Sequence, residues 1–568
     1  MPPTPASWDD TVDLLVIGAG AGGMTASLIA ALDGLEVTLI EKTDQVGGIT
    51  STSGGTLWIP GTRLSIDAGV PDSVEDAARF LDAVMGEREG KEARRAFLAS
   101  GPRVVDDLHA RTRVRLVAAQ AHPDYIGNQP GEAFGGRALS PEVFDGRLLG
   151  REDFVRVRPP RPEFMALGGM MAARNEVDAL LHPLASLENF SIATQRLVRY
   201  AWDRLRYPRG TRLVMGNALV GQLLLSLREA KVPILFDTRL EELVVAEGKV
   251  TGAVLRDPAG NRRVRTRCGV VLASGGLVNH PTLRRELFPS SALARSLAPD
   301  THTGDGLECA LAKGATLAQG LDSPALWMPC SVHRRPDGST AVWPHIILDR
   351  AKPGLIAVNA KGRRFVNEAD SYHAFVMGML ADQGGEQSVP AHLIVDRAFI
   401  ERYLFGLVFR GARGMRRFLR DGYLIEATSL AELATKLEID AAGLAATVEE
   451  FNDHAVTGED PAFGRGSSAM NRFNGDSSHA PNPCVRPLGP GPFYALTVWP
   501  YDLACSAGLA GDSEGRVLDA HGQPIDGLYA CGNDLASIFR GTYPGPGTTL
   551  GPALVMGWRV AKHAGQRR

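Results

Sequence analysis

Short apolar runs and a glycine-rich turn follow one another in a fixed order over the first 41 residues. Residues 13–17 form an apolar run typical of a buried parallel strand, and a second run covers residues 36–40. The stretch from about 22 to 33 between them is predicted to be a helix. This strand–helix–strand order predicts the opening unit of a Rossmann-like α/β domain.

Two later segments repeat the strand-to-glycine pattern. Residues 269–276 and 525–533 each read as an apolar strand that ends in a glycine turn. A helix is predicted from about Thr549, with Gly551 and Pro552 in its first turn. These pieces lie far apart in the sequence, so we expect a discontinuous domain assembled from separate stretches.

The pattern changes between residues 300 and 494, where an inserted α+β cap domain is expected. A helical stretch is predicted to open at His302 and to run to Gly314. The expected fold class is therefore α/β, with the dinucleotide-binding domain formed by residues 1–150, 205–300 and 495–568. The length of 568 residues agrees with more than one domain.

Residues 151–204 are expected to be an excursion that carries no chemistry. Residues 156–162 read as a turn-rich, exposed connection. Helical stretches predicted near 170–181 and 192–205 mix apolar with basic residues. Such a face either packs on the protein with a solvated side or contacts a membrane surface, and both interpretations stay open.

The composition of the chain argues against several classes of function. The net charge of −3 offers no basic field for nucleic acid. The six cysteines lack any CxxC pair, so we expect reduced thiols and no metal site. No apolar run is long enough for a transmembrane helix, and no basic signal region opens the chain. A cytoplasmic protein is expected, with peripheral membrane association as the open alternative.

The turn after the first strand satisfies GxGxxG. Gly18 permits the tight turn, Gly20 lets the backbone approach a pyrophosphate, and Gly23 allows the helix to pack on the strand. Glu41 ends the second strand, where a carboxylate holds the ribose hydroxyls. The cofactor-binding residues expected here are Gly18, Gly20, Ala21, Gly22, Gly23, Glu41 and Lys42.

The loop that follows resembles the flavin-contacting segment of the fumarate reductase and succinate dehydrogenase flavoprotein superfamily. Residues 47–55 are small, polar and glycine-rich, and no histidine lies between Glu41 and Pro60. The resemblance therefore implies FAD held non-covalently. It extends to an ATGG-like and a GLYAxG-like element. The further FAD contacts implied are Gly48, Ser51, Thr52, Ser53, Gly54, Gly55, Ala273, Gly275, Gly276, Gly532, Asn533, Gly547, Thr549 and Leu550.

Within that superfamily, several motifs are similar to the 3-ketosteroid Δ1-dehydrogenases. Residues 361–368 match the GxRFxNE element of the superfamily's cap, and residues 542–553 nearly reproduce the TYxGxGxTxGPA element of the dehydrogenases. Trp58-Ile59-Pro60 also match, and Tyr543 stands where fumarate reductases have a basic residue. Other matches are Asp124-Tyr125, Gly135-Gly136-Arg137 and Asn367-Glu368-Ala369-Asp370-Ser371-Tyr372.

The resemblance implies desaturation beside the carbonyl of a cyclic ketone. Tyr372 would remove the α-proton with help from Tyr125, while Tyr543 and the Gly547 amide would hold the carbonyl oxygen. FAD would take the β-hydride and pass electrons to a quinone or similar acceptor. Because free tyrosine has a pKa near 10, activity should rise toward alkaline pH. Tyr494, Tyr529 and Glu368 are expected to be structural; their sequence surroundings are apolar or belong to the NE element.

Departures from the family keep the substrate open. Asn474 stands where many steroid enzymes of this family have a second tyrosine, and the stretch from Val332 to Trp343 looks rearranged. A smaller ketone, such as cyclohexanone or 4-oxocyclohexanecarboxylate, is therefore an alternative. Two further alternatives are a flavin-dependent enoate or fumarate-type reductase and a flavin-binding protein without turnover.

Overall fold

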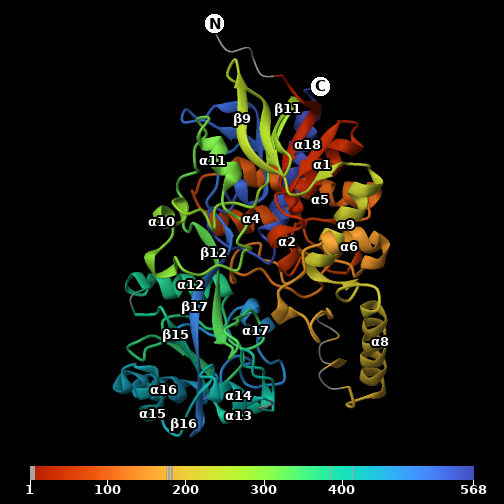
Figure 1. The fold of residues 1–568 in the computed structure, drawn as a ribbon. Helices are drawn as coiled ribbons and strands as arrows, with labels where there is room; N and C mark the ends of the chain where they lie inside the picture. The colour runs from red at the N-terminus through yellow and green to blue at the C-terminus, as the bar shows by residue number, and fades with distance from the viewer. Residues whose placement is uncertain are drawn as a thin grey trace.

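The computed structural model describes residues 7–567 except 174–175, 177–178, 181–182, 386 and 412–413. Figure 1 shows two sheet-centred units, one above the other, with both chain ends at the top of the upper one. The division into the domains predicted above stays a proposal, and the strand pairing supports it.

The upper unit is built on a mostly parallel sheet in the order β18-β19-β11-β1-β2-β8, with β10 paired to β11 and β9 paired to β10. β1 pairs in parallel with both β2 and β11, and β11 pairs in parallel with β19. Its strands come from three separated stretches of sequence, as the discontinuous domain requires. They are β1 (Asp10–Ile17), β2 (Val37–Ile40), β8 (Ile234–Leu235), β9 (Arg239–Ala246), β10 (Lys249–Asp257), β11 (Gly260–Leu272), β18 (Arg516–Leu518) and β19 (Pro524–Ala530).

Helices from both ends of the chain pack on this sheet. α1 (Ala21–Leu32) contacts α18 (Leu550–Gly565) and α9 (Met215–Glu229). A Cβ on Gly557 would lie 2.5 Å from the Gly22 oxygen, so the backbones of α18 and α1 touch directly. The predicted helix over 22–33 and the one from Thr549 are thus confirmed within one residue.

The lower unit has an antiparallel sheet in the order β13-β12-β17-β15-β14, with β16 paired to β17. Its strands are β12 (Ala325–Arg334), β13 (Thr340–Pro344), β14 (Leu355–Val358), β15 (Ala391–Asp396), β16 (Ile425–Ala427) and β17 (Phe493–Cys505). α12 (Tyr372–Ala381) packs on β12, and α15 (Leu430–Leu437) packs on α16 (Ala441–Ala455). Because β17 pairs with this sheet along its length, we propose that the cap extends to Cys505 rather than 494.

Smaller elements complete the chain. Two small sheets contain β3 (Leu57–Trp58), β4 (Leu116–Ala118) and β5 (Ala138–Pro141), and β6 (Phe144–Asp145) with β7 (Arg212–Leu213). In the described part of the chain, further α-helices are α2 (Gly48–Thr52), α3 (Arg63–Asp67), α4 (Val74–Met85), α5 (Lys91–Arg111), α6 (Gly150–Arg156), α8 (Leu187–Arg204), α10 (Leu283–Leu287), α11 (Asp305–Leu311), α13 (Arg397–Arg402), α14 (Met415–Arg420) and α17 (Ala469–Asn474).

The expectations for residues 151–204 need two corrections. Residues 156–162 are half-buried rather than exposed, because Val157 and Pro160 are buried and Val46 pairs with Val157. Residues 170–173 form no helix, and part of the rest of that predicted stretch lies outside the described residues. The second predicted stretch falls largely in α8, which stands at the lower right edge of the molecule (Figure 1).

Candidate active site

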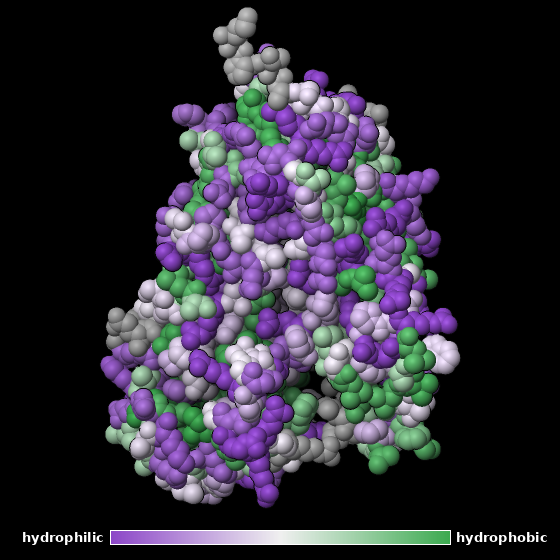
Figure 2. Space-filling view, in the orientation of Figure 1, coloured by the Kyte–Doolittle hydropathy of each residue, from purple (hydrophilic) through white to green (hydrophobic). Residues whose placement is uncertain are grey.

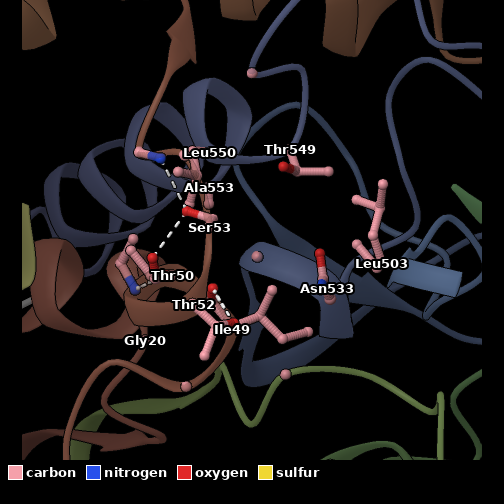
Figure 3. Close-up of a pocket in the computed structure, with 18 of the residues that line it drawn as sticks. Gly20, Ile49, Thr50, Thr52, Ser53, Leu503, Asn533, Thr549, Leu550 and Ala553 are labelled. Carbon is pink, nitrogen blue, oxygen red and sulfur yellow. Dashed lines mark hydrogen bonds between the residues drawn. The ribbon is translucent and has the colours of Figure 1, made fainter. Parts of the chain in front are cut away.

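A cavity of about 760 Å³ joins the glycine-rich turn to the three predicted catalytic tyrosines. Its wall includes Gly18 and Gly20 at one end and Tyr125, Tyr372 and Tyr543 at the other. Figure 3 shows side chains from α2, α18 and the turn after β19 converging on this space. The cavity therefore combines a nucleotide-binding turn with side chains suited to acid–base chemistry.

Most of the residues expected to bind the cofactor line this cavity. They are Gly18, Gly20, Ala21, Gly22, Glu41, Lys42, Gly48, Thr52, Ser53, Gly54, Gly55, Ala273, Gly275, Gly532, Asn533, Gly547, Thr549 and Leu550. Gly23, Ser51 and Gly276 are outside the lining. A Cβ on Gly23 would lie 2.0 Å from the Gly18 oxygen, and the Gly276 amide donates to Asp534 at 2.8 Å. These two residues therefore shape the turns around the site.

Gly18 and Gly20, the first two glycines of the turn, are glycines for different structural reasons. Gly18 has φ +105°, and a Cβ there would lie 2.3 Å from the Ala273 oxygen. Gly20 precedes α1 with φ −81° and ψ −179°. A Cβ on Gly20 meets no atom within 4 Å. Gly18 is required by the fold itself, whereas the open space at Gly20 suits a pyrophosphate at the helix N-terminus.

Glu41 lies where an acid should hold a ribose. Its carboxylate accepts hydrogen bonds from the Ala19 amide at 3.1 Å and from the Thr43 amide at 3.1 Å. Burial raises its pKa, and these hydrogen bonds oppose the rise. The neighbouring Lys42 ammonium is paired with Asp305 at 2.9 Å. The charges at this end are therefore fixed in place.

The sequence argument missed several charged or titratable wall residues, and three of them are Arg158, Arg161 and His302. Arg158 and Arg161 reach the cavity from the segment predicted to be exposed, and His302 enters from the turn before α11. A Cβ on Gly275 would lie 1.9 Å from the His302 ring, so only glycine leaves room for this imidazole. Burial lowers the pKa of His302 to about 4, which keeps it neutral.

The three tyrosine hydroxyls are joined in a chain. Tyr125 donates to Tyr372 at 3.4 Å, and Tyr372 donates to Tyr543 at 2.8 Å. Their ring centroids lie 5.4–5.5 Å apart. The residues are 247 and 171 positions apart in sequence, yet all three side chains are buried in one cluster. This arrangement can pass or share a proton across a cavity wall.

Backbone contacts bring two of these tyrosines together. The Tyr125 amide donates to the Pro544 oxygen at 2.8 Å, directly after Tyr543. Asp124 accepts from the Trp58 indole at 2.8 Å and from Arg137 at 2.6 Å. The motifs at Trp58, Asp124 and Arg137 thus form one buried network that positions Tyr125. Burial raises the pKa of Asp124 to about 6, against the attraction of Arg137.

Tyr372 is the first residue of α12. The Ser371 hydroxyl accepts from the Ala374 amide at 3.1 Å and caps the helix. Arg350 donates hydrogen bonds to the backbone oxygens of Glu368 at 2.8 Å and Asp370 at 3.2 Å. These bonds fix the turn before the helix. Tyr372 therefore sits at a helix N-terminus, where the helix dipole favours negative charge.

Burial opposes ionisation of all three tyrosines. It raises the pKa of Tyr372 well above 10, with further contributions from Tyr125 and Tyr543. It raises the pKa of Tyr543 to about 12, and the hydrogen bond from Tyr372 acts in the opposite direction. The pKa of Tyr125 is also raised, chiefly by burial. The neutral phenols are thus the stable forms at neutral pH.

Gly547 faces the cavity beside Tyr543. It has φ +94°, and a Cβ there would lie 2.3 Å from the Thr56 oxygen, so a side chain is excluded. Its oxygen accepts from the Trp58 amide at 3.1 Å, whereas its own amide donates no hydrogen bond within the described part of the chain. That amide is available to a ligand oxygen.

The residues expected to be structural are buried and paired. Tyr494 and Tyr529 have no exposed surface, and Glu368 contacts Arg364 at 2.7 Å and Arg465 at 3.2 Å. Asn474 is buried outside the cavity lining. None of these side chains lies on the cavity wall.

Comparison with known proteins also indicates an FAD-binding protein, and the matches cover nearly the whole chain. A family model described as an FAD binding domain matches residues 13–550. The 3-oxosteroid 1-dehydrogenase of Mycolicibacterium smegmatis (strain ATCC 700084 / mc(2)155) is 34% identical and covers 97% of this chain and 96% of its own. The crystal structure of 3-ketosteroid delta1-dehydrogenase from Sterolibacterium denitrificans has a TM-score of 0.89 at 33% identity, covering 98% of this chain and 100% of its own.

The chain belongs to the 3-ketosteroid Δ1-dehydrogenase family.

Another relative widens the range of ring ketones associated with this family. The 4-oxocyclohex-2-ene-1-carboxylate 5-dehydrogenase of Sinomonas cyclohexanicum is 37% identical and covers 97% of this chain and 93% of its own. An open flavocytochrome c3 fumarate reductase has a TM-score of 0.62 at 21% identity and shares the fold. The 3-ketosteroid Δ1-dehydrogenase fold is thus the predicted α/β arrangement with an inserted cap.

FAD is the cofactor of this 3-ketosteroid Δ1-dehydrogenase family member. The residues present fit it, because the open space at Gly20 suits a pyrophosphate and Glu41 suits a ribose. Thr549 and Leu550 begin α18 on the cavity wall, where the helix N-terminus favours electron-rich oxygens (Figure 3). Arg158, whose guanidinium donates to the Thr43 hydroxyl at 3.3 Å, adds positive charge at the nucleotide end.

Proposed function

We propose that the protein dehydrogenates a cyclic ketone and introduces a C=C bond beside the carbonyl. The observation that carries this proposal is the tyrosine chain, in which Tyr372 donates to Tyr543 at 2.8 Å on the wall of the FAD cavity. Relatives named for 3-oxosteroids and for an oxocyclohexene carboxylate support the reaction class.

Each side chain has a distinct role in this proposal. Tyr543 and the Gly547 amide donate to the ketone oxygen, which stabilises the charge that develops there as the α-proton leaves. Tyr372, in its ionised form, accepts that proton, and the Tyr125 hydroxyl donates a hydrogen bond to the Tyr372 oxygen and orients it. FAD, when bound, supplies the acceptor for the β-hydride. The substrate thus loses one proton and one hydride, which is a two-electron oxidation.

We further infer that a quinone or similar carrier reoxidises the cofactor. The GxGxxG turn at Gly18–Gly23 is the one dinucleotide fingerprint in the sequence, so a second site for soluble NAD is not expected.

A dicarboxylate reductase has less support from the site. A clamp on two carboxylates needs several basic groups, and the described lining residues at the tyrosine end include one arginine, Arg161, and one histidine, His122. The joined tyrosines also argue against a flavin-binding protein without turnover. If low-potential donors drove enone reduction faster than ketones reduced the flavin, the reductase would be the better assignment.

The test of the proposed function is anaerobic bleaching of the flavin band of the purified holoprotein. 4-Androstene-3,17-dione, cyclohexanone and 4-oxocyclohexanecarboxylate are added separately. Bleaching by any of them, with formation of the enone, supports the proposal. Bound flavin that none of the ketones reduces would contradict it.

The rate of flavin reduction is expected to rise with pH. Since burial raises the pKa of Tyr372 well above 10, the ionised fraction grows up to about tenfold per pH unit below that value. For the same reason folding resists ionisation, so stability is complete below the unfolded pKa of about 10 and falls above it. Stopped-flow rates between pH 7 and 9.5 test this. A flat profile over that range would exclude ionisation of Tyr372 as a step that limits the rate.

The apolar face of α8 supports contact with a membrane surface, and we propose that contact as a second property. Leu187 is 89% exposed, Trp202 64% and Leu205 75%. Arg204 and Arg206 are exposed beside them. Figure 2 shows the apolar side chains gathered at the lower right, over α8. An apolar helix face flanked by arginines suits an anionic lipid surface. None of the described helices is long and apolar enough to cross a bilayer.

Sedimentation with liposomes that contain anionic lipid tests this contact. The wild-type protein should bind at low salt and release at high salt. The double variant Leu187→Glu/Trp202→Glu should bind at least about tenfold more weakly. Val456→Glu, at an exposed apolar residue of the cap, is the matched control and should bind as wild type. No sedimentation of the wild type at low salt would rule the contact out.

A further inference from the structure

The charged residues of the cavity wall divide into two groups. Those in the described wall are Glu41, Lys42, Arg158, Arg161, Arg239 and Asp305. Lys42 pairs with Asp305, Arg158 donates to Thr43, and Arg239 follows Thr238, whose amide donates to the Glu41 oxygen at 3.0 Å. All of these except Arg161 thus belong to the nucleotide end.

Arg161 lies at the tyrosine end. Its guanidinium donates to the Leu297 oxygen at 3.4 Å, and the Leu297 amide donates to Asp502 in β17 at 2.8 Å. Burial raises the pKa of Cys330 and of Tyr501, and the charge of Arg161 opposes both rises. Cys330 and Tyr501 belong to the same packed cluster as the three tyrosines. Arg161 therefore brings a positive charge near Cys330 and Tyr501, which pack in the same cluster as the proposed catalytic tyrosines.

The partners of Arg161 inside the protein are poor. A guanidinium has five N–H donors. The buried Nε of Arg161 makes no hydrogen bond, and its contact with Glu163 is long, at 3.7 Å. Glu163 itself keeps a buried carboxylate oxygen without a hydrogen bond. Half-buried charge without good partners costs free energy unless a ligand completes the set.

The cavity wall beside Arg161 is apolar, so a wholly apolar substrate would leave the charge of Arg161 without a partner. Leu297, Met328, Ile346 and Leu503 line the same end of the cavity. A hydrocarbon ring system placed there would strip water from Arg161 and return no hydrogen bond. A carboxylate would accept two parallel N–H bonds from the guanidinium.

A small substrate has support from a relative. The 4-oxocyclohex-2-ene-1-carboxylate 5-dehydrogenase of Sinomonas cyclohexanicum, 37% identical to this chain, is named for a single-ring ketone that carries a carboxylate.

We propose that Arg161 binds a carboxylate of the substrate, so that the substrate is a single-ring keto acid. The ketone oxygen lies between Tyr543 and the Gly547 amide, and the carboxylate, on the opposite side of the ring, pairs with Arg161. This specificity-determining role rests on the proposed ketone dehydrogenation. 4-Oxocyclohexanecarboxylate is the probe that carries both groups.

Steady-state kinetics with a matched pair of ketones test the role. The pair is 4-oxocyclohexanecarboxylate and its uncharged methyl ester, assayed on the holoenzyme with an artificial acceptor. Arg161→Met should raise KM for the acid by about 10- to 100-fold and leave KM for the ester and kcat nearly unchanged. Glu163→Gln should lower KM for the acid by about two- to fivefold, because it removes a competing carboxylate. Arg334→Met, at an exposed arginine of β12, is the control and should not discriminate.

Arg161→Met and Glu163→Gln should change KM for the acid in opposite directions, so a general folding defect would not reproduce the pattern. Equal losses for acid and ester in Arg161→Met would overturn the role of Arg161. A wild-type preference for 4-androstene-3,17-dione over the acid would overturn it as well. If none of the ketones is oxidised by the wild type, the proposed function itself fails, which is a distinguishable result.

Discussion

Tyr372→Phe should reduce the rate of anaerobic flavin reduction by about 10²- to 10⁴-fold, the usual contribution of a general base. The substitution removes one oxygen atom from a side chain that is buried among Tyr125 and Tyr543. The ring remains, so packing and FAD binding should be retained. Stopped-flow bleaching with a saturating ketone measures the loss, and the dissociation constant for the ketone should change little.

Tyr501→Phe is the matched control. Tyr501 is buried in the same cluster, although it lies outside the cavity lining. Its substitution should leave the rate of reduction within a few-fold of wild type. If Tyr372→Phe kept more than a tenth of the wild-type rate, another base would have to be sought.

Gly20→Asn should weaken FAD binding by about 100-fold or more, because the new side chain occupies the space that a pyrophosphate needs at the N-terminus of α1. The protein itself can accept the change. Gly20 has φ −81°, and a Cβ meets no atom within 4 Å. Asparagine is also a favoured residue at the start of a helix, so the fold should lose little stability. Flavin absorbance of the purified protein and titration with FAD measure the effect.

Gly565→Ala serves as the control, since its Cβ also meets nothing within 4 Å in the last turn of α18. It should bind FAD as wild type and unfold at the same or a slightly higher temperature. An apoprotein of Gly20→Asn with a changed circular dichroism spectrum would mean that the loss comes from misfolding. Full retention of FAD would contradict the placement of the pyrophosphate.

Local chemistry made the nucleotide end predictable. The order of strand, glycine turn, helix and acid over residues 13–41 leaves few alternative structures, and α1 begins within one residue of the prediction. Tyr125, Tyr372 and Tyr543 could be grouped because a family resemblance assigned them one site. Their spacing of up to 247 residues carries no such information by itself.

The missed residues share a physical reason. Arg158 and Arg161 lie in a proline-rich stretch whose composition is that of a surface turn, and local sequence does not tell which side of a turn faces a cavity. The bridge between Val46 and Val157 folds that stretch against the cofactor loop. His302 was placed in a predicted helical stretch, yet it precedes α11 and fits against Gly275. Such contacts depend on tertiary packing.

The contact of α1 with α18 and with Cys531 determines when the nucleotide site can form during synthesis of the chain. A Cβ on Gly22 would lie 3.1 Å from the Cys531 sulfur and 3.3 Å from the Ala553 oxygen, so the two ends of the chain touch at the nucleotide site. During synthesis the amino-terminal half of that site leaves the ribosome more than 500 residues before its counterpart. We therefore expect cofactor loading to follow synthesis of α18, and nascent chains to depend on chaperones until then.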